Sequence, residues 1–234
     1  MEGSDDLSHE VLSELLALMA HDFRNPLSAL HSNVGFLMAC IEPKDDDTRG
    51  ALEDALVSCD GLADIIDNLE ILGQALGARA YSQRVLSLGA LVEEAVKRYS
   101  QLAKSHEVSL ALEPRVGTIT VVSHRGMLAN ALSNVMRNSI QHAPPGSRVR
   151  LAVSARGTTG VVGVFDDGAP LDASNVDPFS ARGQVEAKSH ARARYSRGLG
   201  LLCAALAARA AGAELSSVPQ EHGNGFELRV RAVG

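Results

Sequence analysis

The chain has 234 residues, of which 45% are hydrophobic, 21% are charged and only 3% are aromatic, with no tryptophan. This composition is typical of a globular protein and excludes an intrinsically disordered chain, and the scarcity of aromatic side chains argues against stacking on nucleic-acid bases. The net charge of −6 is divided unevenly: residues 1–76 carry 16 acidic and 3 basic residues, whereas residues 77–234 carry 12 and 19. This asymmetry predicts either two domains that attract each other or simply two solvated surfaces of different charge.

The sequence shows no sign of export or membrane insertion. No apolar run approaches the ~18 residues that a membrane-spanning helix needs, and the polar, acidic start of the chain does not resemble a secretory signal. Cys40, Cys59 and Cys203 are widely separated and lack the spacing of a zinc site. We therefore expect a cytoplasmic protein with reduced cysteines, which binds no membrane and no nucleic acid.

Residues 1–76 are predicted to form an antiparallel helical hairpin. Apolar residues recur every three or four positions, which predicts a long amphipathic helix over about residues 4–40. An acidic, proline-containing turn at residues 42–48 precedes a second helix of the same periodicity. Because two helices alone cannot bury both apolar stripes, we expect a homodimer in which two hairpins form a four-helix bundle.

The remainder of the chain is predicted to be a linker at residues 77–84 and a second domain at residues 85–234. The expected helices are at residues 90–106, 126–144 and 198–212, and the expected strands are at residues 108–114, 118–123, 148–155, 160–168, 213–218 and 226–233. This order predicts an α/β sandwich with helices on one face of a mainly antiparallel sheet, and an α+β class for the whole chain.

The first predicted helix carries a group of polar residues suited to phosphoryl transfer. His21 lies about 200° around an ideal helix from the apolar stripe, and Asn25 lies one turn further on the same face. Asp22 is adjacent, and Pro26 removes a backbone hydrogen bond, so the helix is expected to bend there. An imidazole nucleophile, a carboxylate base and an orienting carboxamide form a plausible site. The alternative is an exposed histidine on a kinked helix.

The run HDFRNPL resembles the H-box of sensor histidine kinases, His-Glu/Asp-x-x-Thr/Asn-Pro, which is met at His21, Asp22, Asn25 and Pro26. The resemblance implies that His21 is phosphorylated, that Asp22 acts as the base, and that Asn25 places a water in the reverse, phosphatase reaction. It also implies a nucleotide-binding domain of the Bergerat type in the second half of the chain.

Four later stretches resemble the nucleotide-binding boxes of this family, in the family's order. They are NALSNVMRNSIQHAP for the N-box, VFDDGAP for G1, VDPFS around Phe179 for the F-box and SRGLGL for G2. By resemblance, Asn138 would bind Mg²⁺ and Asp166 would accept a hydrogen bond from the adenine amino group. The implied ATP-binding residues are Asn134, Asn138, His142, Asp166, Gly168, Gly198, Leu199 and Gly200. Residues 180–197 carry five basic residues, either a loop over the triphosphate or a solvated basic segment.

Three positions depart from the family pattern. Pro170 stands where G1 has its last glycine and fixes φ near −65°, Ser196 replaces the first glycine of G2, and Gln141 stands where many relatives have a basic residue. These departures leave open a second interpretation, in which the chain is a histidine phosphotransferase or a pseudokinase with a degenerate ATP site.

The sequence therefore predicts an ATP-dependent protein histidine kinase that passes the phosphoryl group from His21 to an aspartate of a response-regulator receiver domain. No sensor is recognisable, so we expect the signal to come from a separate protein. An ATP-hydrolysing switch of the chaperone or topoisomerase type is disfavoured because such proteins carry a glutamate where this chain has Asn134. If the hairpin were only a dimeric adaptor, replacing His21 would change nothing. His9 and His31 lack the companions of His21 and are expected to be inert.

Overall fold

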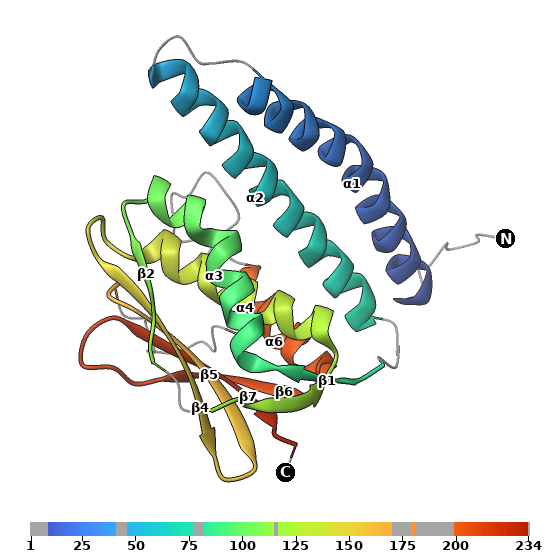
Figure 1. Cartoon of the computed structure of the whole chain (residues 1–234). Coiled ribbons are helices and arrows are strands. Elements are labelled where there is room, and N and C mark those ends of the chain that lie inside the picture. The colour runs from blue at the N-terminus through green and yellow to red at the C-terminus, as the bar shows by residue number, and fades with distance from the viewer. Residues whose placement is uncertain are drawn as a thin grey trace, which may run out of the picture. The chain divides into compact units, whose positions relative to one another are not determined.

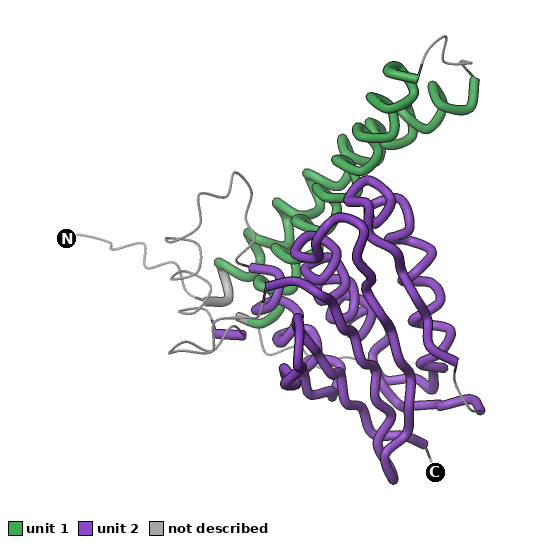
Figure 2. Tube along the Cα trace, turned by 90° about the vertical axis from the view of Figure 1, so that its left-hand side faces the viewer, with its two compact units in different colours: residues 1–79 green, residues 80–234 purple. Residues whose placement is uncertain are grey.

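The computed structural model of the chain describes residues 9–40, 46–76, 82–114, 117–169, 179–180 and 199–233. The chain divides into two compact units, residues 1–79 and residues 80–234 (Figure 2). The first unit is entirely helical where it is described, and the second mixes helices and strands, which confirms the predicted α+β class.

The first unit is a hairpin of two long helices, α1 (His9–Cys40) and α2 (Asp46–Leu76) (Figure 1). Residues 4–8 of the predicted first helix lie outside the described residues. The predicted turn at residues 42–48 is too long, because α2 already begins at Asp46. Asp46 and Asp47 occupy its first turn, where carboxylates interact favourably with the positive end of the helix dipole.

Ion pairs between the two helices confirm that they run antiparallel. Arg24 donates to a carboxylate oxygen of Asp67 and to one of Glu70, each at 2.9 Å. Further along α1, His31 Nε2 lies 3.6 Å from Asp60 Oδ1. The partner on α2 moves towards its N-terminus as the residue on α1 moves towards its C-terminus, which is the register of an antiparallel pair.

The hairpin buries only one flank of the apolar stripe of α1. Ala20 and Val34 are buried, and they mark the flank that packs in the hairpin. The exposed apolar residues of α1 are Leu15, Leu18, Met19, Phe23, Leu30, Phe36 and Leu37. Five of the seven belong to the predicted stripe, so its other flank is open to solvent in the single chain; the five are Leu15, Met19, Phe23, Leu30 and Leu37.

The second unit contains seven strands and three helices in its described part. Their bounds are β1 (Arg84–Ser87), α3 (Leu88–Ser105), β2 (Ser109–Leu112), β3 (Thr120–Ser123), α4 (Arg125–His142), β4 (Arg148–Arg156), β5 (Thr159–Asp166), α6 (Gly200–Ala210), β6 (Ala213–Val218) and β7 (Asn224–Arg231). The main sheet has the order β2-β4-β5-β7-β6, with β2 and β4 parallel and all other neighbours antiparallel. Helices α3, α4 and α6 cover one face of this sheet (Figure 1), as predicted.

A small second sheet was not expected from the sequence. Strand β3 pairs antiparallel with β1, which begins at Arg84, and a single bridge between Val121 and Ala232 joins β3 to the end of the chain. Strand β1 has only four residues, so its own pattern was too short to predict a strand.

Helix α4 is the element that positions the second set of site residues. Its N-terminus is capped by His124, whose Nδ1 accepts a hydrogen bond from the backbone N–H of Met127 at 3.1 Å. Every fourth residue of its inner face is fully buried: Leu128, Leu132, Met136 and Ile140. The row formed by Asn134, Asn138 and His142 lies about 200° around the helix from these residues and so faces away from the apolar row.

None of the three cysteines forms a disulfide; Cys40 is exposed, and Cys59 and Cys203 are buried. Burial raises the pKa of the Cys203 thiol to about 12, so this cysteine remains a neutral core residue of α6. Among the described helices, none combines the length and apolarity needed to cross a membrane.

Candidate functional site

The predicted phospho-acceptor group is exposed on α1. The side chains of His21 and Asp22 are 70% and 79% exposed, and His21 Nδ1 lies 3.5 Å from Asp22 Oδ1. Asn25 is also exposed, one turn further along the helix. An ionised carboxylate only accepts hydrogen bonds, so this contact favours the tautomer with the proton on Nδ1. The lone pair on Nε2 is then available to an electrophile.

Helix α1 continues without interruption through Pro26. The proline has no N–H, so the carbonyl of Asp22 lacks its usual intrahelical partner in the turn that carries His21. In the following turn, the hydroxyl of Ser28 donates to the carbonyl of Arg24 at 2.8 Å. The backbone near His21 is therefore less constrained than that of a regular helix, while the flanking turns stay helical.

Arg24 anchors this region of α1 and was not singled out from the sequence. The pKa of its guanidinium is raised, chiefly by the hydrogen bond to Glu70. The hydrogen bond to Asp67 and the charges of both carboxylates act in the same direction, and together these effects outweigh the lowering by burial. Arg24 is the only lysine or arginine in α1, in a segment that is strongly acidic. That isolation was the signal in the sequence that could have identified it.

The second group of predicted residues gathers around α4. Asn134 is buried, Asn138 is half-buried and His142 is exposed. A Cβ on Gly168 would lie 2.8 Å from the carbonyl oxygen of His142, so the segment after β5 passes directly against the end of α4. A Cβ on Gly200 would lie 3.5 Å from Asn134 Oδ1, so α6 begins beside the middle of α4. The fold thus brings the N-box, G1 and the last glycine of G2 together.

Asp166 ends β5, and its side chain has one satisfied and one unsatisfied oxygen. The residue is 3% exposed, and Oδ1 accepts hydrogen bonds from the backbone N–H of Gly168 at 2.9 Å and from Asn224 Nδ2 at 3.0 Å. Oδ2 is buried and accepts no hydrogen bond within the described part of the chain. Leaving a buried carboxylate oxygen without a donor is costly, so this atom fits a ligand that supplies an N–H, such as the amino group of adenine.

The start of α6 is suited to bind phosphate. Leu199 is the N-cap residue and makes no side-chain capping hydrogen bond, so the first amide N–H groups of the helix are not capped by it. A helix N-terminus with available N–H groups is a favourable site for anions. Gly198, Pro170, Ser196 and the five basic residues between the F-box and G2 lie outside the described residues.

The F-box phenylalanine contacts the core of the second unit. The ring of Phe179 meets the ring of the fully buried Phe226 edge to face, with centroids 6.4 Å apart and an angle of 79°. This contact ties the short described segment of residues 179–180 to strand β7, next to the strand that carries Asp166.

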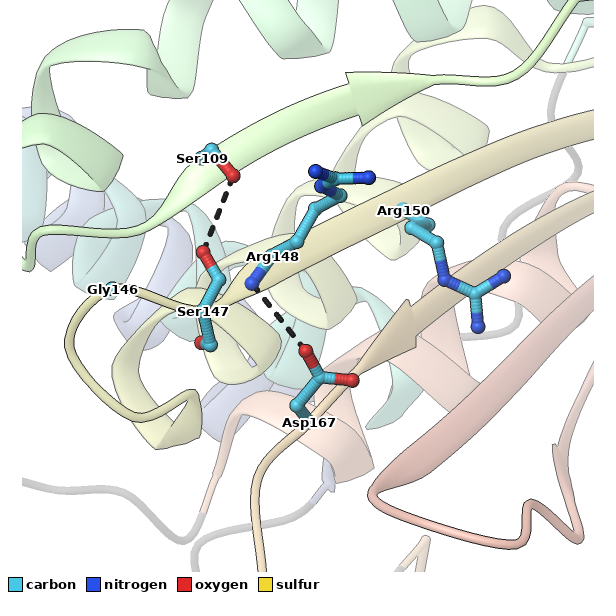
Figure 3. Close-up of a pocket in the computed structure, with 6 residues that line it drawn as sticks. All are labelled: Ser109, Gly146, Ser147, Arg148, Arg150 and Asp167. Atoms are coloured by element: carbon cyan, nitrogen blue, oxygen red, sulfur yellow. Dashed lines mark hydrogen bonds between the residues drawn. The ribbon is translucent and has the colours of Figure 1, made fainter.

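A polar pocket of about 360 Å³ lies elsewhere, at the start of β4 (Figure 3). It is lined by Ser109, Gly146, Ser147, Arg148, Arg150 and Asp167. The two arginines alternate with the buried Val149, so they lie on the sheet face opposite the helices. Successive strand residues point to opposite faces, so Asp167 points away from the side chain of Asp166. None of the predicted site residues lines this pocket.

Comparison with known protein families gives two matches, in separate parts of the chain. The family model of the His Kinase A (phospho-acceptor) domain matches residues 11–75. The family model of the histidine kinase-, DNA gyrase B- and HSP90-like ATPase matches residues 123–233. The chain carries both domains of a histidine kinase.

Curated relatives of the chain include sensor-like histidine kinases and sensor proteins. The chain is 26% identical over 189 residues to the sensor-like histidine kinase SenX3 of Mycolicibacterium smegmatis, and the match covers 80% of this chain and 49% of that protein. The chain is also 26% identical over 196 residues to the sensor protein CzcS of Cupriavidus metallidurans, and that match covers 82% of this chain and 40% of CzcS. The chain thus spans about half the length of the curated relatives it matches.

Solved histidine kinase structures share the fold. Full-length ShkA, crystallised with AMPPNP, matches with a TM-score of 0.64 at 19% identity, covering 94% of this chain and 46% of ShkA. The histidine kinase AdeS of Acinetobacter baumannii matches with a TM-score of 0.54 at 13% identity, covering 92% of this chain and 98% of AdeS. These matches confirm a histidine kinase fold that comprises a helical hairpin and a Bergerat-type sandwich.

Proposed function

We propose that this chain is a protein histidine kinase that uses Mg-ATP to phosphorylate His21 and passes the phosphoryl group to an aspartate of a response-regulator receiver domain. The observation that carries the proposal is the exposed His21–Asp22 pair, on a helix within the segment that matches the phospho-acceptor family. The same chain carries an ATPase-family domain with a buried carboxylate oxygen that lacks a donor.

At His21, the arrangement supports nucleophilic attack by Nε2. Its lone pair forms a bond to the γ-phosphorus of ATP as the bond from that phosphorus to the bridging oxygen breaks and ADP leaves. The attack makes the imidazole cationic, and Asp22, 3.5 Å from Nδ1, accepts the Nδ1 proton. The high exposure of both side chains allows the triphosphate and a receiver domain to approach the same imidazole.

In the second unit, the proposed nucleotide site follows the geometry around α4. Asp166 would accept a hydrogen bond from the adenine amino group through Oδ2, and Gly168 would let the chain pass close to the base. The N–H groups at Leu199 and Gly200, with Gly198 before them, would bind phosphate oxygens, and His142 would approach the phosphates.

Asn138 would hold Mg²⁺ through its carboxamide oxygen, and Asn134 completes the polar row behind it. The described residues contain no group of three His, Cys, Asp or Glu side chains that could hold a metal ion by themselves. Mg²⁺ commonly takes few protein ligands and several oxygens from phosphates and waters, so one amide oxygen is compatible with its chemistry. The ion would neutralise phosphate charge during transfer.

We also infer two partners. A second copy of the chain would cover the exposed apolar flank of α1, which gives a homodimeric four-helix bundle. A receiver domain would dock beside His21, where the carboxamide of Asn25 could place a water for dephosphorylation of the regulator.

The test is incubation of the purified chain with γ-labelled ATP and Mg²⁺, followed by detection of alkali-stable, acid-labile label. His21→Ala should abolish the label. His31→Ala is the matched control, because His31 is another exposed histidine of α1 with a carboxylate nearby, and it should keep the label. Label that persists in His21→Ala would contradict the proposal.

The second candidate, a phosphotransferase or pseudokinase, gives a different result in the same assay. The chain would then bind no ATP and acquire no label from it, yet His21 would accept a phosphoryl group from a phosphorylated receiver domain. The unpaired Oδ2 of Asp166 favours the kinase, because the buried oxygen is costly to keep without a ligand that donates to it.

A further inference from the structure

Asn224 is a buried polar residue of the second unit. It is the first residue of β7 and the register partner of Asp166, the last residue of β5. Asn224 is 7% exposed, and its Nδ2 donates to Asp166 Oδ1 and to the carbonyl of Ala169, both at 3.0 Å. Because both partners can only accept, the assignment of Nδ2 as the contacting atom is unambiguous.

These hydrogen bonds determine which oxygen of Asp166 is left for a ligand. The terminal torsion of an aspartate is broad and roughly two-fold, so an unrestrained carboxylate exchanges its two oxygens. Here Oδ1 accepts two hydrogen bonds, one from the backbone N–H of Gly168 and one from Asn224 Nδ2. Oδ2 is the oxygen without a partner among the described residues, and it is buried. The carboxylate is therefore oriented before any ligand binds.

The turn before β7 is built to bring Asn224 to this place. Gly223 has a φ of +77°, and a Cβ added there would collide with the carbonyl oxygen of Asp166. Only glycine combines that backbone conformation with so close an approach to the neighbouring strand. The second hydrogen bond of Asn224, to Ala169, holds the segment that follows Asp166 against the same residue.

We propose that Asn224 is a positioning residue for base recognition, which aims Asp166 Oδ2 at the exocyclic 6-amino group of the purine. This inference rests on the proposed binding of ATP in the second unit. Asn224 contributes to the affinity for purines that carry a 6-amino group, and it contributes little to the affinity for purines that lack one.

The test compares ATP with purine riboside triphosphate, which lacks the 6-amino group, by calorimetric titration of the full chain with Mg²⁺ present. The wild type should bind ATP roughly tenfold or more tightly than the analogue, as expected for one hydrogen bond to a charged acceptor. Asn224→Ala should bind ATP roughly tenfold more weakly and the analogue within about twofold of wild type, so that the preference collapses.

Two further variants keep the test informative. Asn224→Leu removes the donor at similar volume and should also lose the preference, which covers the case that the alanine variant does not fold. Val230→Ala removes buried volume from the same strand, away from Asp166, and should lower the melting temperature while it keeps the preference.

Each remaining outcome is decisive. A wild type that binds neither nucleotide overturns the proposed function, and the role of Asn224 with it. A wild type that binds both equally, an Asn224→Ala variant that keeps the preference, or one that loses both nucleotides to the same degree overturns the role of Asn224 alone. The last result would show that the residue only supports the fold.

Discussion

Among single residues, two buried serines of the second unit differ in whether their hydroxyl groups form a hydrogen bond. The hydroxyl of Ser123 donates to the carbonyl of Ala211 at 2.7 Å, whereas the hydroxyl of Ser139 has no partner within the described chain. Both residues are fully buried. Ser139 follows Asn138 in α4, so an unsatisfied polar group lies in the helix that carries the proposed Mg²⁺ ligand.

The two serines should respond to alanine with opposite signs. Ser139→Ala removes a hydroxyl that was desolvated without compensation and should raise the free energy of unfolding by about 1 kcal/mol. Ser123→Ala leaves the Ala211 carbonyl without its donor and should lower that free energy by about 1–2 kcal/mol. Urea denaturation of the full chain measures both, and a loss of stability in Ser139→Ala would contradict the reasoning.

A local sequence pattern can predict neighbouring positions when its residues are contiguous in the chain. His21, Asp22 and Asn25 are close in the chain, so helical geometry alone placed them on neighbouring positions. Asn224 acts on Asp166 from 58 residues away, and nothing in either local sequence indicates the pairing. Such contacts depend on strand register, which local patterns do not encode.

At the scale of elements, the sheet face opposite the helices carries a buried carboxylate. Glu227 of β7 has a side chain only 4% exposed, and it accepts hydrogen bonds from Arg156 at 2.7 and 3.1 Å and from Arg229 at 2.6 and 3.1 Å. Its cross-strand neighbour is Gly163, which offers no side chain of its own. The two arginines therefore cover the carboxylate on a face that none of the described helices covers.

The cluster of Glu227, Arg156 and Arg229 should make the free energy of unfolding depend on pH in the acidic range. Burial by itself raises the pKa of Glu227, but the hydrogen bonds and charges of Arg229 and Arg156 outweigh it, so the pKa lies below its ordinary value. A group with a lowered pKa stabilises the fold above its ordinary pKa, near 4.3, and loses that contribution as the pH falls through the lowered value.

Glu227→Gln should therefore lower the free energy of unfolding by about 1–2 kcal/mol at pH 7. Its deficit relative to wild type should shrink as the pH falls below about 4. Glu113→Gln is the control, because Glu113 pairs with Arg150 on the same face at half exposure and should change stability by less than about 1 kcal/mol. A deficit that stays constant down to pH 3 would disprove the assignment.

At the scale of the whole molecule, the exposed flank of α1 predicts the oligomeric state. Leu30 and Leu37 lie two turns apart on this flank and are both exposed in the single chain. Burying such residues against a second copy would recover roughly 25 cal/mol for each Å² of apolar surface removed from water. The hydrophobic effect therefore favours dimerisation through this flank.

A double substitution tests that interface. Leu30→Glu with Leu37→Glu should convert the dimer to a monomer in sedimentation velocity experiments, because four carboxylates would be brought together in the bundle. Ser32→Glu with Ala39→Glu adds the same charge at the same spacing, about 200° around the helix from Leu30 and Leu37 respectively, and should leave the dimer intact. A monomeric wild type would refute the predicted bundle.

The sequence alone determined the two-part organisation, the helices with strong 3.6-residue periodicity and the H-box, because each depends on residues close together in the chain. The tertiary structure decided which flank of the α1 stripe packs against α2, in a hairpin whose ion pairs join Arg24 and His31 to carboxylates of α2. It also decided that β3 pairs with β1 and that Asn224 orients Asp166. Pairing between distant segments is governed by the packing of the whole domain, which no local pattern specifies.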